Sequence, residues 1–255
     1  MPQIIDLSVP LEDQAVSEPF PASIRYIDHA EGGRQMEALF GVRREDLVYS
    51  DGHGWASEEV TAITHTGTHV DAPYHYGAIS GDLPALRIDE LPLDWFYAPG
   101  VVLDIRDLPA GELVTPAHLQ QRLDAIGHRL AARQIVLLQT GCDKKIDSTE
   151  YFQQPGLGRE AVLWLIEQGV RVIGIDAYTL DRPFAAMKAD YEQDGDGRAI
   201  WPAHFAGLTA AYCQIEKLAN LDQLPAPSGF TLSCLPVKIA RASAGWCRAV
   251  AIFED

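Results

Sequence analysis

The sequence is poor in cysteine and in basic residues, and both shortages exclude classes of protein. None of its four cysteines lies in a C-x-x-C pair, so the sequence does not indicate a zinc site built from cysteines. Lysine and arginine total 20 against 36 acidic residues, which gives a net charge of −16. Because such a surface repels phosphate backbones and anionic lipids, we expect neither a nucleic-acid partner nor a membrane partner.

Long apolar runs, a secretory leader and a serine nucleophile motif are also missing. No apolar stretch approaches the roughly 18 residues that a transmembrane helix needs. Residues 1–6 lack the charged and then apolar pattern of a signal sequence, so we expect the protein in the reducing cytoplasm. No G-x-S-x-G motif occurs, which argues against a serine hydrolase of that type.

The rest of the composition is typical of a globular protein. Of the 255 residues, 47% are hydrophobic and 22% are charged, and no linker or repeat divides the chain, so we predict a single domain over residues 1–255. The pattern predicts helices that begin at Thr115 and at Arg159. It predicts strands at residues 3–8, 58–64, 101–105, 135–140, 170–176, 211–216, 229–238 and 249–253. The predicted fold class is therefore mixed α/β with more strand than helix.

One eleven-residue run indicates chemistry most clearly. It reads His65-Thr-Gly-Thr-His69-Val-Asp71-Ala-Pro-Tyr-His75 and holds three of the eight histidines. Histidine and carboxylate side chains suit zinc, manganese and iron. A lone histidine is usually packed or solvated, but three histidines and an aspartate gathered around a glycine indicate a metal site.

Geometry requires the chain to turn between His65 and His69. In an extended strand their Cα atoms would lie about 13 Å apart, at roughly 3.3 Å per residue, which is too far to bind one ion. Gly67 permits the turn, because glycine adopts backbone conformations that other residues avoid. We therefore predict a tight turn after the strand at residues 58–64, with His69 and Asp71 pointing to one side.

A second pair of side chains suited to metal lies downstream. His204 is followed twelve residues later by Glu216, which ends a predicted apolar strand. A buried glutamate needs a cation or a hydrogen-bond network, but a surface histidine and a salt-bridged glutamate would produce the same pattern. Two roles also stay open for His75, which either carries a proton or binds the metal.

The run from His65 to His75 resembles the H-x-G-T-H-x-D-x-P-x-H signature of the cyclase-type metal-dependent hydrolases, a family that includes bacterial kynurenine formamidases and isatin hydrolase. Other stretches are similar to the longer members, namely Gly54-Trp55 and residues 181–184, 201–207, 212–218 and 243–246. The resemblance implies a swivelling β/β/α domain with a mixed, strand-rich core, assembled as a homodimer or homotetramer.

The same resemblance implies roles for individual residues. Those that match the family's metal ligands are His65, His69, Asp71, His204 and Glu216. His75 matches the proton donor and acceptor, and the ligand set implies one or two zinc or manganese ions per subunit. Phe20 stands near the place where kynurenine formamidases have a tryptophan on the substrate, which implies substrate binding by Phe20.

The resemblance further implies a hydrolase with a small-molecule substrate. A divalent ion lowers the pKa of bound water and polarises a carbonyl group, which suits cleavage of a C–N bond in a cyclic amide or aryl formamide, or of a lactone C–O bond. Two alternatives stay open: a kynurenine formamidase that deformylates N-formylkynurenine in tryptophan degradation, and a metal-binding protein without turnover. The long region at residues 24–54 and the phenylalanine at position 20 set the chain apart from the kynurenine formamidases.

Overall fold

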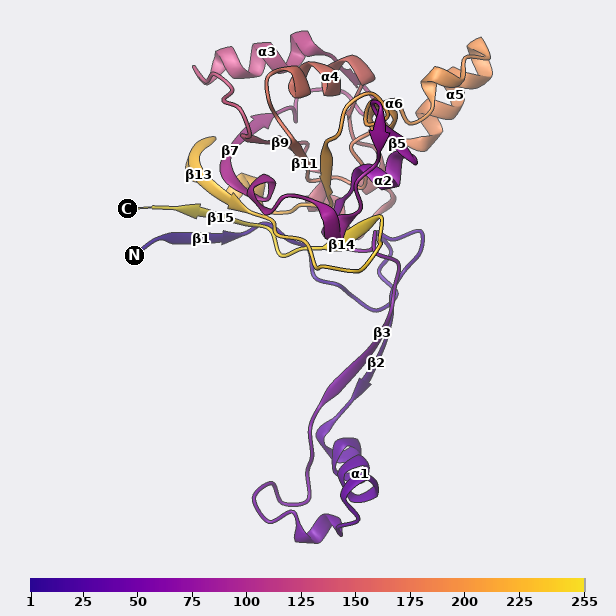
Figure 1. The fold of residues 1–255 in the computed structure, drawn as a ribbon, viewed down its shortest axis with the longest axis vertical. Helices are drawn as coiled ribbons and strands as arrows, with labels where there is room; N and C mark the ends of the chain where they lie inside the picture. The colour runs from indigo at the N-terminus through magenta and orange to yellow at the C-terminus, as the bar shows by residue number, and fades with distance from the viewer. Residues whose placement is uncertain (255) are drawn as a thin grey trace. The chain divides into compact units, whose positions relative to one another are not determined.

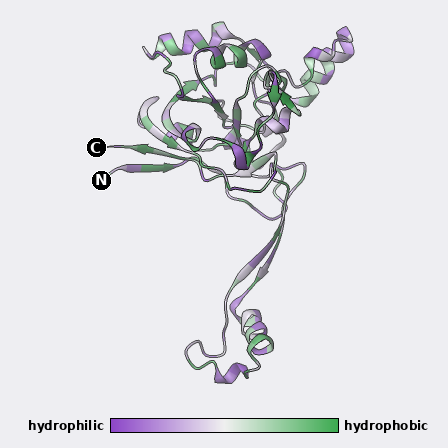
Figure 2. Cartoon of the chain, viewed as in Figure 1, coloured by the Kyte–Doolittle hydropathy of each residue, from purple (hydrophilic) through white to green (hydrophobic). Residues whose placement is uncertain are grey.

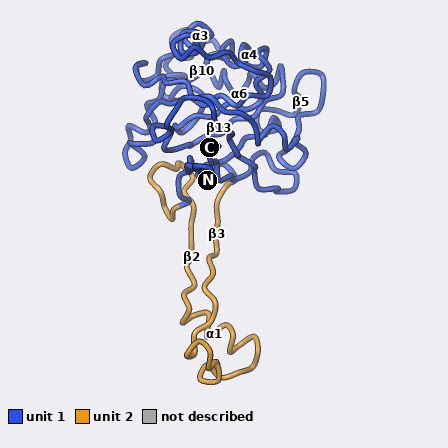
Figure 3. The backbone as a smooth tube through the Cα atoms, turned by 90° about the vertical axis from the view of Figure 1, so that its left-hand side faces the viewer, with its two compact units in different colours: residues 1–11, 64–255 blue, residues 12–63 orange. Residues whose placement is uncertain are grey.

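The computed structural model describes residues 1–254, which divide into two compact units (Figure 3). One unit joins residues 1–11 to the chain from residue 64 onwards, and the other consists of residues 12–63. The single domain expected over residues 1–255 stays a prediction.

The larger unit is organised by a sheet that has nine strands among the described residues (Figure 1). In sheet order the strands are β1 (Gln3–Asp6), β15 (Val250–Phe253), β13 (Ser228–Ser233), β7 (Tyr97–Asp104), β9 (Ile135–Gln139), β11 (Val172–Ile175), β12 (Cys213–Glu216), β4 (His69–Asp71) and β14 (Ala244–Trp246). The neighbours from β7 to β12 run parallel, and the remaining pairs are antiparallel. This curled sheet confirms the predicted α/β class with a mixed, strand-rich core.

The central strands are buried on both faces, and a separate hydrophobic core packs against each. In β9, Val136 and Leu138 point into one core, while Ile135 and Leu137 point into the other. The first core lies beneath α3 (Pro116–Ala125) and α4 (Arg159–Glu167), which lie together over β7, β9 and β11 in Figure 1. Burial on both faces explains why these strands are continuous apolar runs in the sequence.

The remaining helices of this unit are short or polar. They are α2 (Pro73–Tyr76), α5 (Phe184–Asp194) and α6 (Pro202–Ala206). Both α3 and α5 show purple and green residues in Figure 2, as surface helices do. Two small sheets complete the unit, formed by β5 (Ile79–Ser80) with β6 (Leu83–Pro84) and by β8 (Leu113–Val114) with β10 (Gly156–Leu157). No helix within residues 1–254 has the length and apolar character to span a membrane.

The smaller unit contains a hairpin and one longer helix. Strands β2 (Ser23–Ile27) and β3 (Ser57–Thr61) pair antiparallel, and α1 (His29–Phe40) lies between them in the sequence. Asp28 caps α1 by accepting from the backbone N–H of Glu31. Sequence patterns did not predict α1, because Gly32 and Gly33 weaken its helical signal.

Several predicted strands are shorter in the structure, and the one at residues 229–238 loses the most residues. The expectation of a strand at residues 229–238 is wrong beyond Ser233, where β13 ends. Pro236 follows closely, and proline has no backbone N–H for a ladder. The predicted helix start at Thr115 is confirmed, because its hydroxyl accepts from the backbone N–H of His118.

Candidate metal centre

A tight turn carries the histidine run into the sheet. Gly67 has φ +68°, a left-handed conformation that favours glycine, and β4 begins two residues later at His69. Two contacts with Lys217, the residue after β12, fasten the turn: Lys217 Nζ donates to the carbonyl of His65 at 2.7 Å, and Thr68 Oγ1 donates to the carbonyl of Lys217 at 2.6 Å. The turn predicted at Gly67 is therefore confirmed.

Sheet register brings distant residues to this turn. Glu216 in β12 is the partner of His69 in β4, and Gln214 is the partner of Asp71. Direct partners in an antiparallel pair share a face, and so do residues two apart on one strand. His69, Asp71 and Glu216 therefore point to the same side of the sheet.

Two histidines of the sequence motif meet at the carboxylate of Asp71. His65 Nδ1 lies 2.8 Å from Asp71 Oδ1, and His69 Nε2 lies 3.2 Å from the same oxygen. The Nδ1 atom of His69 is 2.8 Å from the carbonyl oxygen of Gly67, a contact in which Nδ1–H donates. That bond leaves the Nε2 atom of His69 facing Asp71.

The downstream pair completes the cluster. Glu216 lies 3.7 Å from both His69 Nε2 and His204 Nε2, and His204 Nε2 lies 3.8 Å from Asp71 Oδ2. Leu180 N–H donates to Glu216 at 3.2 Å. The structure thus brings together all six polar residues that the sequence singled out: His65, His69, Asp71, His75, His204 and Glu216.

The cluster has the properties of a site for a divalent cation. Among the described residues, His69 Nε2 and both carboxylate oxygens of Asp71 are buried without a hydrogen-bond partner. Two sets of residues each offer ligand atoms that all lie within 4.8 Å of one another. One set is His65, Asp71 and His75, and the other is His69, Asp71 and Glu216. Buried polar atoms without partners are costly, and a cation would satisfy them. The residues present therefore fit a metal.

The protonation of the cluster follows from burial and from neighbouring charges. Burial disfavours an ionised Asp71, but the imidazoles of His69 and His65 outweigh it and hold the pKa of Asp71 well below its usual range. Burial, together with the negative charge of Asp71, raises the pKa of Glu216. Burial lowers the pKa of His75 to about 4, which leaves a neutral ring at pH 7. Two carboxyl groups thus repel one another in a buried space, and a divalent cation would relieve that repulsion.

Aromatic rings enclose His75 and His204. The Trp201 ring stacks on His204 with centroids 4.3 Å apart and 7° between the planes, and its centroid lies 5.5 Å from that of His75. Tyr76 meets His204 edge-on at 5.4 Å. Trp201 has φ +53°, an unusual backbone conformation for a bulky residue. These rings restrict water on one side of the cluster.

Two further aromatic side chains are exposed. Phe20 belongs to the smaller unit and is 67% exposed, so its predicted contact with substrate stays a prediction. Phe184, the first residue of α5, is 51% exposed, and its ring centroid lies 5.8 Å from that of Tyr178.

Sequence reasoning did not single out several residues that support the cluster. Asp181 contacts Nδ1 of His204, Ser243 Oγ lies 3.2 Å from Nε2 of His65, and Lys217 fastens the turn. A signal existed for Lys217, since a charged residue directly after a buried glutamate indicates compensation of charge. Nothing in the pattern around Asp181 or Ser243 indicates their partners, because those partners are distant in the sequence.

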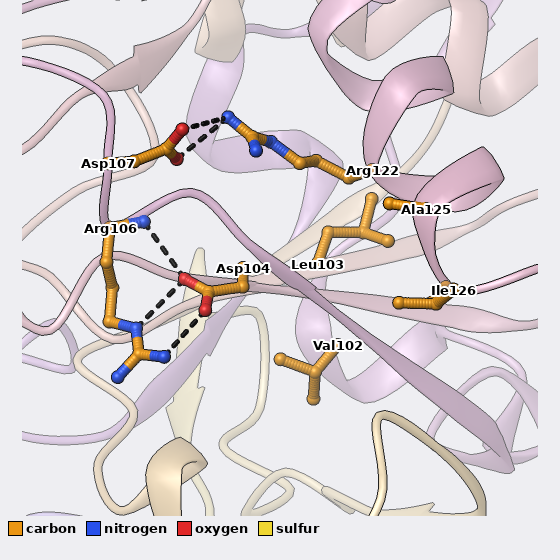
Figure 4. Close-up of a pocket in the computed structure, with 8 residues that line it drawn as sticks. All are labelled: Val102, Leu103, Asp104, Arg106, Asp107, Arg122, Ala125 and Ile126. Carbon is orange, nitrogen blue, oxygen red and sulfur yellow. Dashed lines mark hydrogen bonds and ion pairs between the residues drawn. The ribbon is translucent and has the colours of Figure 1, made fainter.

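A separate cavity of about 500 Å³ opens between β7 and α3 (Figure 4). Its two arginines are paired: Arg106 contacts Asp104 at 2.6 Å, and Arg122 contacts Asp107 at 2.8 Å. The cavity contains none of the clustered histidines, and its charges neutralise one another. It is not a candidate for the metal chemistry.

Known proteins share both the sequence pattern and the fold. A family model described as "Putative cyclase" matches residues 5–182. Kynurenine formamidase from Bordetella petrii is 28% identical over 251 residues, which cover 98% of each chain, and the enzyme of that name from Salinibacter ruber is 31% identical over 73% of this chain and 75% of its own. Isatin hydrolase A from Labrenzia aggregata, solved with benzyl benzoate, has a TM-score of 0.76 at 26% identity, covering 100% of this chain and 94% of its own. The chain belongs to the cyclase family.

Proposed function

We propose that the chain is a metal-dependent hydrolase that cleaves a C–N bond of a small cyclic amide or aryl formamide, or a lactone C–O bond. One observation carries the proposal: the buried Asp71 carboxylate, without a hydrogen-bond partner among the described residues, faces the equally buried Nε2 atom of His69. The names of the related proteins support this class of substrate, since isatin hydrolase opens a cyclic amide and kynurenine formamidase cleaves a formamide.

The metal would be held by residues from both halves of the cluster, namely His65, His69, Asp71, His204 and Glu216. When bound, a divalent ion supplies a Lewis acid for the carbonyl group and makes water acidic enough to react near neutral pH. The Gly67 carbonyl keeps the proton of His69 on Nδ1, so that Nε2 stays free to bind. Zinc and manganese both accept this ligand set, as one ion or two per subunit.

His75 would move the proton. Its ring is neutral at pH 7 and stands 4.1 Å from the ring of His65, so it accepts a proton as water attacks the carbonyl carbon. The protonated ring then donates to the leaving nitrogen or oxygen as the C–N or C–O bond breaks. Trp201, with its edge toward His75, limits access of bulk water to this transfer.

A panel of substrates tests the proposal. N-formylkynurenine, isatin, hydantoin and simple lactones would be incubated with the zinc-loaded and the manganese-loaded protein, with and without chelator. We expect hydrolysis of at least one cyclic amide or lactone, lost with chelator and restored by metal. Activity on N-formylkynurenine alone would establish the second candidate, a kynurenine formamidase. Absence of turnover with metal bound would support a metal-binding protein without activity and contradict the main proposal.

Assembly and location are further parts of the proposal. A homodimer or homotetramer is supported by the smaller unit, in which Ile27 is the one large apolar side chain buried among its described residues, while Val48 and Tyr49 are exposed. A cytoplasmic location is supported by the four cysteines, all of which are free thiols. Light scattering after size exclusion and cell fractionation test these two points; a monomer at micromolar concentration, or a periplasmic protein, would contradict them.

A further inference from the structure

A buried aspartate outside the proposed ligand set holds the second histidine of the cluster. Asp181 is fully buried, and its Oδ1 accepts from the backbone N–H of Ala203 at 2.7 Å. Its Oδ2 accepts from the backbone N–H of His204 at 3.3 Å and is in direct contact with Nδ1 of the His204 ring. One carboxylate therefore caps α6 and binds the imidazole that α6 carries.

The orientation of Asp181 is fixed by the packing around it. Gln154 Nε2 donates to the Asp181 carbonyl at 2.9 Å, and a Cβ on Gly156 would lie 2.2 Å from the Asp181 carbonyl carbon. The far side of α6 is held by Tyr212, whose hydroxyl donates to the carbonyl of Ala203 at 2.6 Å. Because neither the carboxylate nor the helix has room to move, the contact with His204 is built into the fold.

A carboxylate acts on an imidazole in a specific way. It can only accept hydrogen bonds, so the ring nitrogen that faces it must carry the proton. On the neutral ring of His204 that nitrogen is Nδ1, and the lone pair is then on Nε2, the atom that lies 3.8 Å from Asp71 and 3.7 Å from Glu216. Partners of this kind fix the tautomer and orientation of metal-binding histidines.

We propose that Asp181 is a positioning residue that keeps the proton of His204 on Nδ1 and thereby makes Nε2 available to a metal shared with Asp71 and Glu216. This inference rests on the proposed metal centre. It adds that metal binding by His204 depends on a residue that would not itself touch metal or substrate.

The variant Asp181→Asn tests the role with little change in volume. Its amide oxygen still accepts a backbone N–H, but its NH₂ group faces the His204 ring and needs an acceptor there. Nδ1 then becomes the acceptor, the ring proton moves to Nε2, and the metal position next to Asp71 and Glu216 loses a ligand. Loss of such a partner typically weakens metal binding by about 10- to 100-fold.

Zinc and manganese affinities would be measured by competition with a chromophoric chelator for the wild type, Asp181→Asn and the control Asp176→Asn. Asp176 is also buried and accepts backbone N–H groups, those of Thr140 and Gly141, but the structure records no contact between it and a proposed ligand. We expect weaker binding in Asp181→Asn only. If Asp181 only caps α6, the metal-free Asp181→Asn variant should have a lower thermal midpoint but an unchanged affinity for metal. That result would overturn the proposal.

The wild type provides a second measurement that does not depend on folding of a variant. In the zinc-loaded protein, ¹⁵N-resolved NMR of the histidine rings should show the His204 proton on Nδ1, in a low-field resonance, with Nε2 bound to metal. A proton on Nε2 would overturn the role of Asp181 while leaving the metal centre intact. A wild type that binds neither zinc nor manganese would overturn both the metal centre and this inference.

Discussion

Glu216 and His69 are direct partners across the antiparallel ladder of β12 and β4. Their side chains meet because of strand register, and no local sequence pattern joins them. A slip of one residue in this pairing would turn His69 and Asp71 to the opposite face and leave Val70 in their place. The geometry of the cluster is therefore a property of the sheet.

The glycine of the turn provides a test of that geometry. Replacing Gly67 by alanine places a Cβ in a left-handed conformation, at a cost of roughly 1–2 kcal/mol in stability. Gly127 is a matched control, since its φ is +62° against +68° for Gly67 and a Cβ there meets nothing within 4 Å. We expect similar losses of unfolding free energy in both variants but weaker zinc binding in Gly67→Ala alone. Equal zinc affinities would show that the turn does not set the ligand positions.

Metal binding and proton transfer can be separated by two substitutions in the motif. His69→Ala removes a fully buried candidate ligand, so we expect loss of bound metal, measured by elemental analysis. His75→Ala should keep the metal and lose about 100-fold or more in kcat, as expected for a general acid–base group. The exposed His53 serves as a control whose replacement by alanine changes neither quantity. An empty site in His75→Ala would make His75 a ligand, the role that its distance to Asp71 also allows.

Removal of metal should destabilise the protein. Binding to the native state alone adds about 4 kcal/mol when free metal is 1,000 times its Kd. For a chain of this length, that corresponds to a shift of roughly 10 °C in thermal midpoint. Differential scanning fluorimetry with and without EDTA measures the shift, which His69→Ala should abolish. If EDTA shifts the variant as much as the wild type, the cation responsible binds elsewhere.

The buried carboxyl group of Asp176 should make the stability of the protein depend on pH. Burial raises the pKa of this carboxyl group from its ordinary 3.8 to about 6, although Thr140 and Gly141 donate hydrogen bonds that oppose the rise. Its native state therefore holds a proton that the unfolded chain releases, so its contribution is present below pH 4 and is lost as the pH rises through 6. The difference in unfolding free energy between wild type and Asp176→Asn should fall by about 2 kcal/mol from pH 4 to pH 7, as measured by urea denaturation. A flat or rising difference would mean that the hydrogen bonds outweigh burial.

The sequence predicted those parts of the fold and of the cluster that depend on residues close together in the chain. The α/β class follows from apolar runs that become strands buried on both faces, and the turn at Gly67 follows from the distance that two histidines have to close. Helix α1 was missed because Gly32 and Gly33 are poor helix formers. Both glycines are needed for close packing inside the smaller unit, where a Cβ on Gly32 would lie 1.8 Å from the carbonyl oxygen of Trp55.

Long-range contacts set the limit of sequence reasoning at the cluster. The pairing of His204 with the first histidines came from a family resemblance, because the ladder that joins β12 to β4 leaves no periodic trace in either strand. Asp181 caps α6 through hydrogen bonds from the backbone N–H groups of Ala203 and His204. Its contact with Nδ1 of His204 depends on how α6 is placed against the 181–182 backbone, and no spacing rule describes that placement.

The position of β4 in the sheet also affects the order in which the cluster can form during synthesis. This three-residue strand lies between β12 and β14, so its two hydrogen-bonding neighbours are made long after it. Until the ribosome has released the segment around Ala244–Trp246, both the partner for one edge of β4 and the serine beside His65 are still absent. A nascent chain would thus expose its histidines without the scaffold that aligns them until Trp246 has emerged, and stable binding of a metal would begin only after that point.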